Sequence, residues 1–486
     1  MSTTEQSETA TEPAPPPAPD RSDTRNGLFA LAMRLHFYAG VFVAPFILIA
    51  ALTGALYAIA PTLEQVVNHD LLHVNSTGTA RPLSDQVAAG VATDPKLALA
   101  AVDPAQRAGD TTRVLFTDPS LGESEQRAVF VDPVTARPVG TTVVYGSSGS
   151  LPLRTWIDQL HRNLHLGQAG RLYSEAAASW LWVVALAGVA VWVSRARRAP
   201  GIARRLLWPD RHRTGRLRTM NWHATVGMWL LLPLLFLSAT GMTWSTYAGA
   251  HVDAVRAALS WTTPTAHTAL TGSTARQTGS AMPGMDMPAP GSNAPRHDNP
   301  DPRTRAAEVD RVFAVARAHA VDGAVEITVP ATDDTAYVVK QRRIPGQLAQ
   351  DSIAIDGRTG GVVDTVRFAD WPLMAKLANW GIQLHMGMMF GLANQVLLLV
   401  TMLALVTVIG RGYLMWWRRR PHRAGRFAVG AAPRRGTLRR LPMPVLALLT
   451  AVTVLAGWFA PVLGVSLLGF LAVDVALGFA RRRAAA

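Results

Sequence analysis

The sequence predicts an α-helical integral membrane protein of about six transmembrane helices, with two small α+β extracytoplasmic domains and an internal duplication. Three observations predict this fold. Two apolar stretches, at 36–54 and 223–241, are near copies of each other. Several apolar runs are long enough to cross a bilayer of about 30 Å. Arginine clusters abut the ends of these runs, as in the cytoplasmic loops of membrane proteins.

The two near copies share one pattern of small and polar residues. A histidine opens each stretch, a glycine follows four residues later, and a Thr-Gly pair closes it eighteen residues on. At 3.6 residues per turn, offsets of four and eighteen fall on one helix face. Each stretch is therefore predicted to be a membrane helix with His36 or His223 near one end. Gly40 or Gly227 follows one turn deeper on the same face.

The distribution of charge indicates a membrane orientation. The chain has 486 residues, of which 49% are hydrophobic and 16% charged, and its formal charge is +14. Nine arginines lie between 195 and 218, ten between 411 and 440, and three at 481–483. This is the positive-inside pattern, not a basic groove interleaved with base-stacking aromatic residues, so we exclude nucleic acid as a partner. The chain has no cysteine, which excludes disulfides and iron–sulfur clusters.

The first half of the chain is expected to form a tail, a helix, a polar domain and a second helix. Residues 1–26 are rich in Pro, Thr, Ser and Glu, which predicts a disordered, uncleaved N-terminal tail. The first transmembrane helix is expected at 34–60 and the first extracytoplasmic domain at 62–153, with short strands broken by Asp-Pro and Gly signals. The second helix is expected at 156–194, and a cytoplasmic Arg-rich loop at 195–220.

The second half repeats this order. A third helix is expected at 221–247, and a Gly-, Pro- and Met-containing flexible linker at 262–304. The second extracytoplasmic domain follows at 305–370, with one helix and then strands. The remaining elements are a fourth helix at 373–417, a cytoplasmic Arg-rich loop at 418–440 and a hairpin of two shorter helices at 442–480. Six spans place both termini in the cytoplasm and both domains outside it.

The duplication extends to single residues. Asp132 in the first domain aligns with Asp356 in the second, each followed three residues later by a threonine. An Asp-x-x-Thr sequence between two strands suits a tight turn, so we interpret these aspartates as structural. The helices after the domains align His165 with His385. The first copy adds His161, one turn earlier.

The sequence contains a set of short motifs: AspProValThr at 132–135, AspGlyArgThrGly at 356–360, PheAlaAspTrpPro at 368–372, LeuHisMetGlyMetMetPheGlyLeuAlaAsnGln at 384–395, and the histidine entries to the first and third helices. As a set these motifs resemble those of the PepSY-associated transmembrane family. The resemblance covers about residues 30–420, and it implies PepSY-like outer domains in a cytoplasmic (inner) membrane protein. It also implies a link to iron regulation, since the family includes ferrisiderophore reductases. The resemblance implies nothing for the C-terminal hairpin.

Paired histidines are the candidate cofactor ligands. Topology places His36 and His223 near the cytoplasmic face, and His165 and His385 near the outer face. Two imidazoles from facing helices can supply both axial ligands of a haem iron. A glycine one turn away, Gly40 or Gly227, would leave room for the flat porphyrin. The resemblance implies two b-type haems.

Alternatives stay open at each of these positions. A histidine at a helix end can instead be an interface residue bonded to lipid or backbone, and His161 can replace His165 as the outer ligand. Met282, Met285 and Met287 cluster in the linker, where thioethers would favour Cu(I), although we favour the interpretation of this segment as a low-complexity tether. Met386, Met388 and Met389 are expected to pack the helix. The remaining histidines are expected at solvated positions: His69, His73, His212, His251, His267, His297, His319 and His422.

Three functions are compatible with these features. The first is a haem-containing electron conduit that reduces a ferric siderophore complex outside the cytoplasm, because Fe(II) is held more weakly than Fe(III) by hard-oxygen chelators. No GxGxxG follows a strand, so there is no flavin or nicotinamide motif, and a cytoplasmic donor or membrane quinol must supply the electrons. The second is a non-enzymatic regulator or binding protein anchored by its helices. The third is a copper-handling component.

Overall fold

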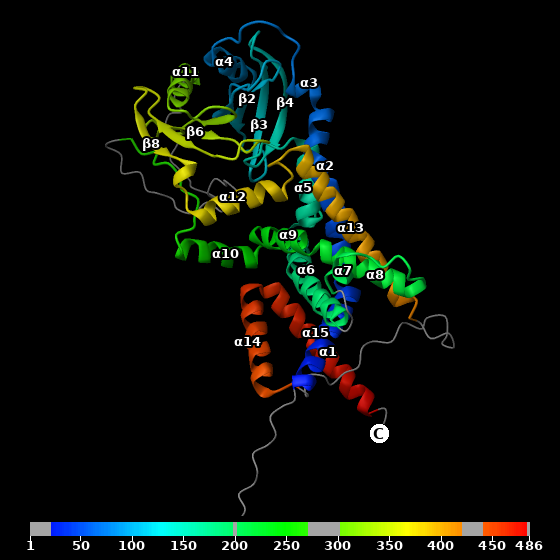
Figure 1. The fold of residues 1–486 in the computed structure, drawn as a ribbon. Helices are drawn as coiled ribbons and strands as arrows, with labels where there is room; N and C mark the ends of the chain where they lie inside the picture. Colours follow the sequence, from blue (N-terminus) through cyan, green and yellow to red (C-terminus); the bar gives the residue numbers. More distant parts are fainter. Residues whose placement is uncertain (1–20, 198–201, 271–301, 420–440, 484–486) are drawn as a thin grey trace, which may run out of the picture.

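The computed structural model describes residues 21–197, 202–270, 302–419 and 441–483. The structure consists of a bundle of helices with a β-sheet at one end, and further helices cover one face of that sheet (Figure 1). Helices α2 (Ala44–Val67) and α13 (Leu392–Trp417) run away from the sheet, and a helical hairpin lies at the opposite end. The linker methionines Met282, Met285 and Met287 lie outside the described residues, as does most of the second arginine loop.

The first predicted membrane helix is two helices in near continuity. Helix α1 spans Arg21–Phe42 and α2 spans Ala44–Val67, so part of the predicted tail and the start of the predicted outer domain are helical. The short helix α3 follows at His69–Leu72. The break falls at Val43, where Pro45 occupies the first turn of α2 and lacks a backbone N–H.

The other predicted helices are also interrupted. Two separate helices replace the helix predicted at 156–194: α5 spans Pro152–Asn163 and α6 spans Gly167–Ala196. Leu164 and His165 between them have left-handed backbones, with φ of +53° and +56°. The remaining helices are α7 at Ile202–Leu207, α8 at Gly215–Trp229, α9 at Leu231–Thr243, α10 at Tyr247–Ala258, α12 at Leu373–His385, α13 at Leu392–Trp417, α14 at Met443–Phe459 and α15 at Pro461–Arg483.

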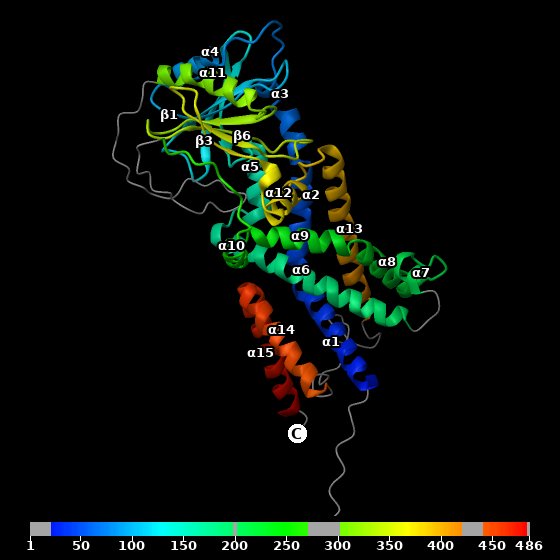
Figure 2. The same ribbon diagram turned by 60° about the vertical axis from the view of Figure 1, so that its left-hand side comes forward.

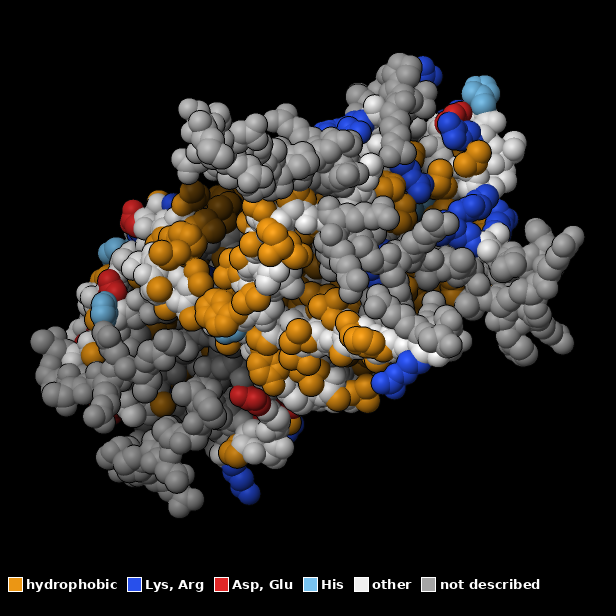
Figure 3. Space-filling view, turned by 90° about the horizontal axis from the view of Figure 1, so that it is seen from below, with side chains coloured by type: hydrophobic (Ala, Val, Ile, Leu, Met, Phe, Trp, Pro, Cys, Tyr) orange, Lys and Arg blue, Asp and Glu red, His pale blue; other side chains and the backbone are white. Residues whose placement is uncertain are grey.

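Several helices are long and apolar enough to cross a membrane. Within the described residues these are α2, α6 and α13, and α8 with α9 gives a fourth if the pair, bent by 56°, is one span. Helices α14 and α15 have shorter apolar stretches, so the six predicted spans stay a prediction. Apolar side chains gather across the middle of the face seen from below, with Lys and Arg toward its edges (Figure 3). Such an apolar surface suits a lipid bilayer.

Equivalent helices of the two repeats make equivalent contacts. Helix α2 lies against α13 and α5, and in the second half α9 lies correspondingly against α6 and α12. Helix α1 likewise contacts α6, as α8 contacts α13. A buried apolar cluster that includes Ile47, Leu234 and Leu405 joins these helices. Figure 2 shows α2 and α13 side by side, with α6 and α9 crossing them.

The two predicted outer domains share a single antiparallel sheet. Its order is β4-β3-β2-β1-β5-β6-β7-β8, and the halves meet where β1 pairs with β5, with Ala101 opposite Thr328 and Val102 opposite Ile327. The sequence predicted two small domains. The structure instead joins them in one sheet, because the first strand of one repeat pairs with the first strand of the other. The strands are β1 at Ala98–Asp103, β2 at Thr112–Thr117, β3 at Glu125–Asp132, β4 at Arg137–Tyr145, β5 at Val325–Thr328, β6 at Tyr337–Gln341, β7 at Ser352–Ile355 and β8 at Val362–Val366.

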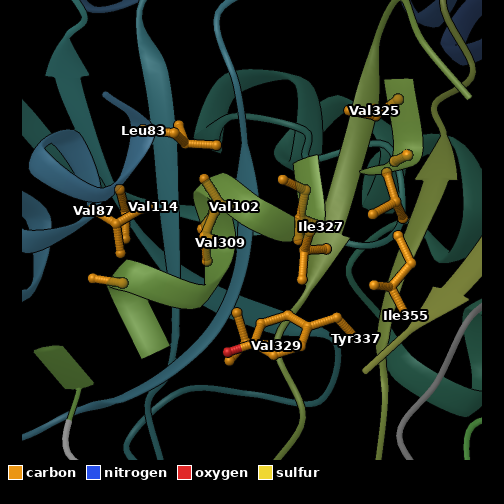
Figure 4. Close-up of a cluster of buried hydrophobic side chains, with 14 of the residues drawn as sticks. Leu83, Val87, Val102, Val114, Val309, Val325, Ile327, Val329, Tyr337 and Ile355 are labelled. Carbon is orange, nitrogen blue, oxygen red and sulfur yellow. The ribbon is translucent and has the colours of Figure 1, made fainter. Parts of the chain in front are cut away.

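One hydrophobic core lies beneath both halves of the sheet. Helices α4, at Leu83–Thr93, and α11, at Pro302–Ala318, pack against each other and cover it. Val102 and Val114 from the first repeat meet Ile327 and Val309 from the second in this core, and all four are fully buried (Figure 4). The outer part of the chain is therefore one folded unit made by two repeats.

The two aspartates of the aligned motif hold the turns between strands. Asp132 accepts hydrogen bonds from the Val134 backbone N–H at 2.8 Å and the Thr135 hydroxyl at 2.8 Å, between β3 and β4. Asp356 accepts equivalent bonds from the Arg358 backbone N–H and the Thr359 hydroxyl, both at 2.9 Å, between β7 and β8. The structural role predicted for the two aspartates agrees with these contacts.

Candidate functional site

His36 and His223 meet inside the bundle. His36 is on α1 and His223 on α8, and their ring centroids are 5.9 Å apart. The Nδ1 atom of His36 lies 2.9 Å from the carbonyl oxygen of Val184, and that of His223 lies 2.9 Å from the carbonyl oxygen of Val408. A carbonyl oxygen can only accept, so each Nδ1 carries the proton and each Nε2 keeps a lone pair. We call these two residues the inner pair.

Each ring of the inner pair lies over a glycine of the helix it bonds. A Cβ placed on Gly188 would come within 2.7 Å of His36 Cε1, and one placed on Gly412 would come within 3.6 Å of His223 Cε1. In both repeats the glycine is four residues after the valine that accepts the hydrogen bond, so carbonyl and glycine share one face. The approach at Gly188 requires a residue without a side chain.

His161 and His385 form the second pair, at the end of the bundle nearer the sheet. The Nδ1 atom of His161 lies 3.0 Å from the Thr53 hydroxyl, and that of His385 lies 2.6 Å from the Thr240 hydroxyl. Each threonine hydroxyl also donates to a carbonyl one turn earlier in its own helix. Because a hydroxyl has a single proton, its oxygen must accept from the histidine, and Nε2 again keeps a lone pair. These two residues are the outer pair.

The Thr-Gly pairs at the ends of the near-copied stretches thus have a defined place. A Cβ of Gly54 would lie 3.1 Å from His161 Cε1, and a Cβ of Gly241 would lie 3.7 Å from His385 Cε1. Threonine supplies the hydrogen bond while the adjacent glycine lets the ring approach. Sequence analysis singled out these pairs as repeat markers and missed their contacts with the histidines.

The outer pair lines a cavity of about 260 Å³. An aromatic residue follows each Thr-Gly pair by three positions and also lines it. Tyr57 lies parallel to the His161 ring at a centroid distance of 6.1 Å, whereas Trp244 meets the His385 ring edge-on at 5.2 Å. The cavity reaches the loop after β4, around Tyr145, so it connects the outer pair to the underside of the sheet.

Three other residues that the sequence proposed for cofactor binding, His165, Gly40 and Gly227, do not contact either histidine pair in the way expected. His165 is exposed, with its ring 5.0 Å from Trp156, and it does not line the cavity. The alignment of His165 with His385 rested on a shared sequence motif. In the structure α5 ends at Asn163, and it is His161, in the last turn of α5, that contacts a threonine and lines the cavity as His385 does. A Cβ on Gly40 or Gly227 would meet no atom within 4 Å, so both positions face open space.

Two further expectations concern single side chains. Met388 and Met389 are buried, and the Met388 sulfur accepts a hydrogen bond from Arg154, which agrees with packing. His251, expected in solvent, instead stacks on Trp458 at 4.9 Å and bonds the carbonyl oxygen of Phe459 through Nδ1. His251 therefore joins α10 to the C-terminal hairpin.

The two histidine pairs fit a cofactor in which most ligands of the metal ion belong to the cofactor itself. Among the described residues, no three or more His, Asp or Glu side chains gather as they would around a protein-bound metal ion. Two imidazoles can supply the axial ligands of a haem, whose porphyrin supplies the other four. Metal-ligating histidines usually donate the other ring N–H to an oxygen, as all four do here. Imidazoles that share one metal ion, with bonds of about 2.0–2.1 Å, have centroids roughly 6 Å apart, as the inner pair has.

These features define a membrane protein built from a duplicated helix bundle, with a histidine pair toward each end and a shared extramembrane sheet. The chain belongs to the PepSY-associated transmembrane family, whose model, described as the PepSY-associated TM region, matches residues 33–419. The match leaves out the hairpin of α14 and α15. No curated protein matches the chain.

Proposed function

We propose that this protein carries electrons across the cytoplasmic membrane and reduces a ferric siderophore or a similar ferric complex on the outer side. The observation that supports this is the common state of four histidines in two pairs. Each Nδ1 is committed to an oxygen of the protein, and each Nε2 is available to a metal. When bound, haem b at each pair would supply one-electron redox chemistry.

The residues of the chain set where such cofactors would sit. His36 and Thr53 are separated by 17 residues of a nearly continuous helix, which corresponds to about 25 Å at 1.5 Å per residue. The inner and outer pairs therefore lie toward opposite faces of a hydrocarbon layer of roughly 30 Å. Valine carbonyls fix the inner imidazoles and threonine hydroxyls fix the outer ones, so each ring is oriented before it binds a metal.

The orientation follows from charge. The arginine clusters at 195–218 and 411–440 favour the cytoplasm for the loops that carry them and for both termini, which leaves the sheet outside. Electrons would enter at the inner pair from a cytoplasmic donor or a quinol. They would leave near His161 and His385, where the cavity opens toward the sheet.

An absorbance spectrum of the purified protein tests the cofactor. We expect a red protein with a sharp α-band after addition of dithionite. Replacing His36 or His223 by alanine should remove about half of the haem, and replacing His161 or His385 should remove the other half. His165→Ala is the matched control, since that ring is exposed, and it should keep full haem. A colourless wild-type protein would instead favour a membrane-anchored regulator.

Reoxidation tests the reaction. Dithionite-reduced protein in detergent should lose one electron for each Fe(III) complex added, and a ferrous chelator should trap the Fe(II) released. Rapid discharge from protein that keeps only its outer pair would show that the acceptor acts at that end. If reduced protein holds its electrons for many minutes with excess ferric siderophore, iron reduction is not its function.

A further inference from the structure

A buried ion pair joins the first turn of α5 to α2. Arg154 is on α5 and Glu64 on α2, both side chains are buried, and Arg154 Nη1 lies 3.5 Å from Glu64 Oε1. The second carboxylate oxygen of Glu64 accepts the backbone N–H of Leu151, the residue before α5 begins, at 2.7 Å. Glu64 therefore holds both the backbone and a side chain of the start of α5 against α2.

Arg154 also reaches the loop that follows the other outer histidine. Its Nη2 atom donates to the Met388 sulfur at 3.3 Å. Met388 is three residues after His385, in the short loop between α12 and α13. Arg154 interacts in addition with the Tyr57 hydroxyl on α2. A guanidinium group is a planar fork with several donors, so one arginine can contact side chains from three segments at once.

Arg154 and His161 lie on the same face of α5. They are seven residues apart, about two helical turns, and both face α2. Thr53 and Glu64 lie correspondingly on one face of α2, where Thr53 contacts His161 and Glu64 contacts Arg154. Helix α5 has only 12 residues, and a left-handed residue, Leu164, follows it. The position of α5 along α2 is thus fixed by polar contacts at both ends of this short helix.

The second repeat has no equivalent of this ion pair. Ala378 is the residue seven positions before His385, and His251 stands where the first repeat has Glu64. An alanine cannot pair with a charge, and His251 bonds the C-terminal hairpin instead. The single cation Arg154 therefore contacts elements of both repeats, close to the two histidines of the outer pair.

We propose that Arg154 is a positioning residue for the outer pair. It holds the helix of His161 and the loop beside His385 in one arrangement, and so sets the separation of the two imidazoles. The inference rests on the proposed function for its purpose, because two axial ligands of one metal ion must be held to within about 0.5 Å of their working geometry. Arg154 does not line the cavity itself, so its effect is exerted through the two histidines.

Spin labels measure this arrangement without reference to a cofactor. The chain has no cysteine, so Trp156→Cys on α5 and Phe390→Cys in the loop, both at exposed positions, can each carry one Gd(III) label. Dithionite leaves Gd(III) unchanged and makes any low-spin haem diamagnetic. We expect Arg154→Met to shift and broaden the distribution of label distances. Arg305→Met is the matched control, because it breaks a buried ion pair with Glu308 on α11, at 3.3 Å, and should leave the label distances unchanged.

A double variant separates positioning from stability. Arg154→Met leaves the Glu64 carboxylate buried without its counter-charge, which destabilises a fold strongly, whereas removing both charges is tolerated far better. Glu64→Gln combined with Arg154→Met should therefore recover thermal stability. It should not recover the label distances, because Met388 and Tyr57 still lack the arginine. This double variant decides the question if Arg154→Met alone does not fold. The inference is overturned if label distances match the wild type in either variant, because the ion pair would then only stabilise the protein.

Haem spectra then separate this inference from the proposed function. We expect Arg154→Met to lower the haem affinity of the outer pair about tenfold and to leave the inner pair unaffected. It should also change the g-values of the ferric outer haem, which depend on the angle between the imidazole planes. A wild type without haem overturns the proposed function, while the label distances still decide the role of Arg154. If the labels move but the affinity and g-values of the outer haem do not, Arg154 does not position the imidazoles and the inference fails.

Discussion

At the level of single residues, Thr53 and Thr240 decide which nitrogen of the outer histidines is available. Their hydroxyl oxygens accept the Nδ1 proton because their own protons are given to helix carbonyls. A valine of the same shape would leave Nδ1 without this acceptor, and the ring would lose both its tautomer preference and its orientation. The threonines thus orient the two histidines that we propose as cofactor ligands.

We therefore expect Thr53→Val and Thr240→Val to lower haem affinity about 10- to 100-fold, the usual effect of removing the partner of a metal-ligating histidine. Haem titration followed at the α-band measures this loss. Thr53→Ser keeps the hydroxyl and should keep the affinity. Thr450→Val is a matched control, since Thr450 donates to the Leu446 carbonyl in the same way but lies on exposed α14. Unchanged affinity in both valine variants would contradict a ligand role for His161 and His385.

The glycines beside the inner pair give an asymmetric prediction. Gly188→Ala would place a methyl group 2.7 Å from His36 Cε1, closer than van der Waals contact allows, so the ring must move. Gly412→Ala would place its methyl group 3.6 Å from His223 Cε1, which is an ordinary contact. We expect the first variant to lose the inner haem and the second to retain it, as read from dithionite-reduced spectra. Equal effects of the two repeat-related changes would contradict this packing.

At the level of secondary structure, the turn aspartates make the outer sheet sensitive to acid. Burial raises the pKa of Asp132, but hydrogen bonds from Ser76, Thr135 and two backbone amides outweigh it, so the pKa is below its usual range. The pKa of Asp356 is lowered in the same way, against burial, by hydrogen bonds from Arg358 and Thr359. A carboxylate whose folded pKa is depressed stabilises the fold above its unfolded pKa of about 3.9, and this contribution is lost as pH falls through the folded value.

Amide hydrogen exchange in the β3–β4 turn checks this sign. Protection of the Val134 amide should be constant near neutral pH and should fall below about pH 4 as Asp132 is protonated. Asp132→Asn should show weaker protection at pH 7 and little further loss in acid, because it has no charge to lose. Asp370→Asn, a change at an exposed carboxylate outside this turn, should follow the wild type. If protection of the Val134 amide in the wild type is the same at pH 3 as at pH 7, the Asp132 carboxylate does not stabilise the turn.

The position and apolar character of most helices could be predicted from the sequence, but their interruptions could not. The hydrophobicity of residues 156–194 gives no sign of the left-handed backbone at Leu164 and His165. Because the helix breaks there, it is His161, and not His165, that contacts Thr53 and lines the cavity. Pro45 and Pro233 were visible signals of irregularity near the breaks in the two copied stretches. The histidines themselves could be found, because repeated polar residues in apolar helices are rare. Their threonine and carbonyl partners depend on packing across the bundle.

At the level of the whole molecule, the feature furthest from the sequence is the union of the two outer repeats. The strands β1 and β5 are more than two hundred residues apart, and each repeat has a plausible pattern for a separate domain. The sequence of an edge strand does not reveal which strand it pairs with, since pairing uses backbone N–H and C=O groups that are alike in nearly every residue. The pairing gains its specificity from the common core, in which α4 and α11 pack together.

A cysteine pair tests this union and the orientation in one experiment. Ala101 and Thr328 are opposite each other across the β1–β5 junction, and opposed residues of antiparallel strands have Cα atoms about 4.5–5.5 Å apart, within reach of a disulfide. The chain has no cysteine of its own, so the double variant Ala101→Cys, Thr328→Cys can form only this link within one molecule. We expect it to form spontaneously in cells, because the proposed orientation puts the sheet on the oxidising side of the membrane, and to shift mobility on a non-reducing gel. The pair Ala101→Cys, Thr365→Cys is the control, since β8 is at the far edge of the sheet, and it should remain reduced. If neither pair links in cells but the first links after oxidation of purified protein, the sheet is joined as described and lies in the cytoplasm. If the first pair resists oxidation in the purified protein as well, the two repeats do not share a sheet.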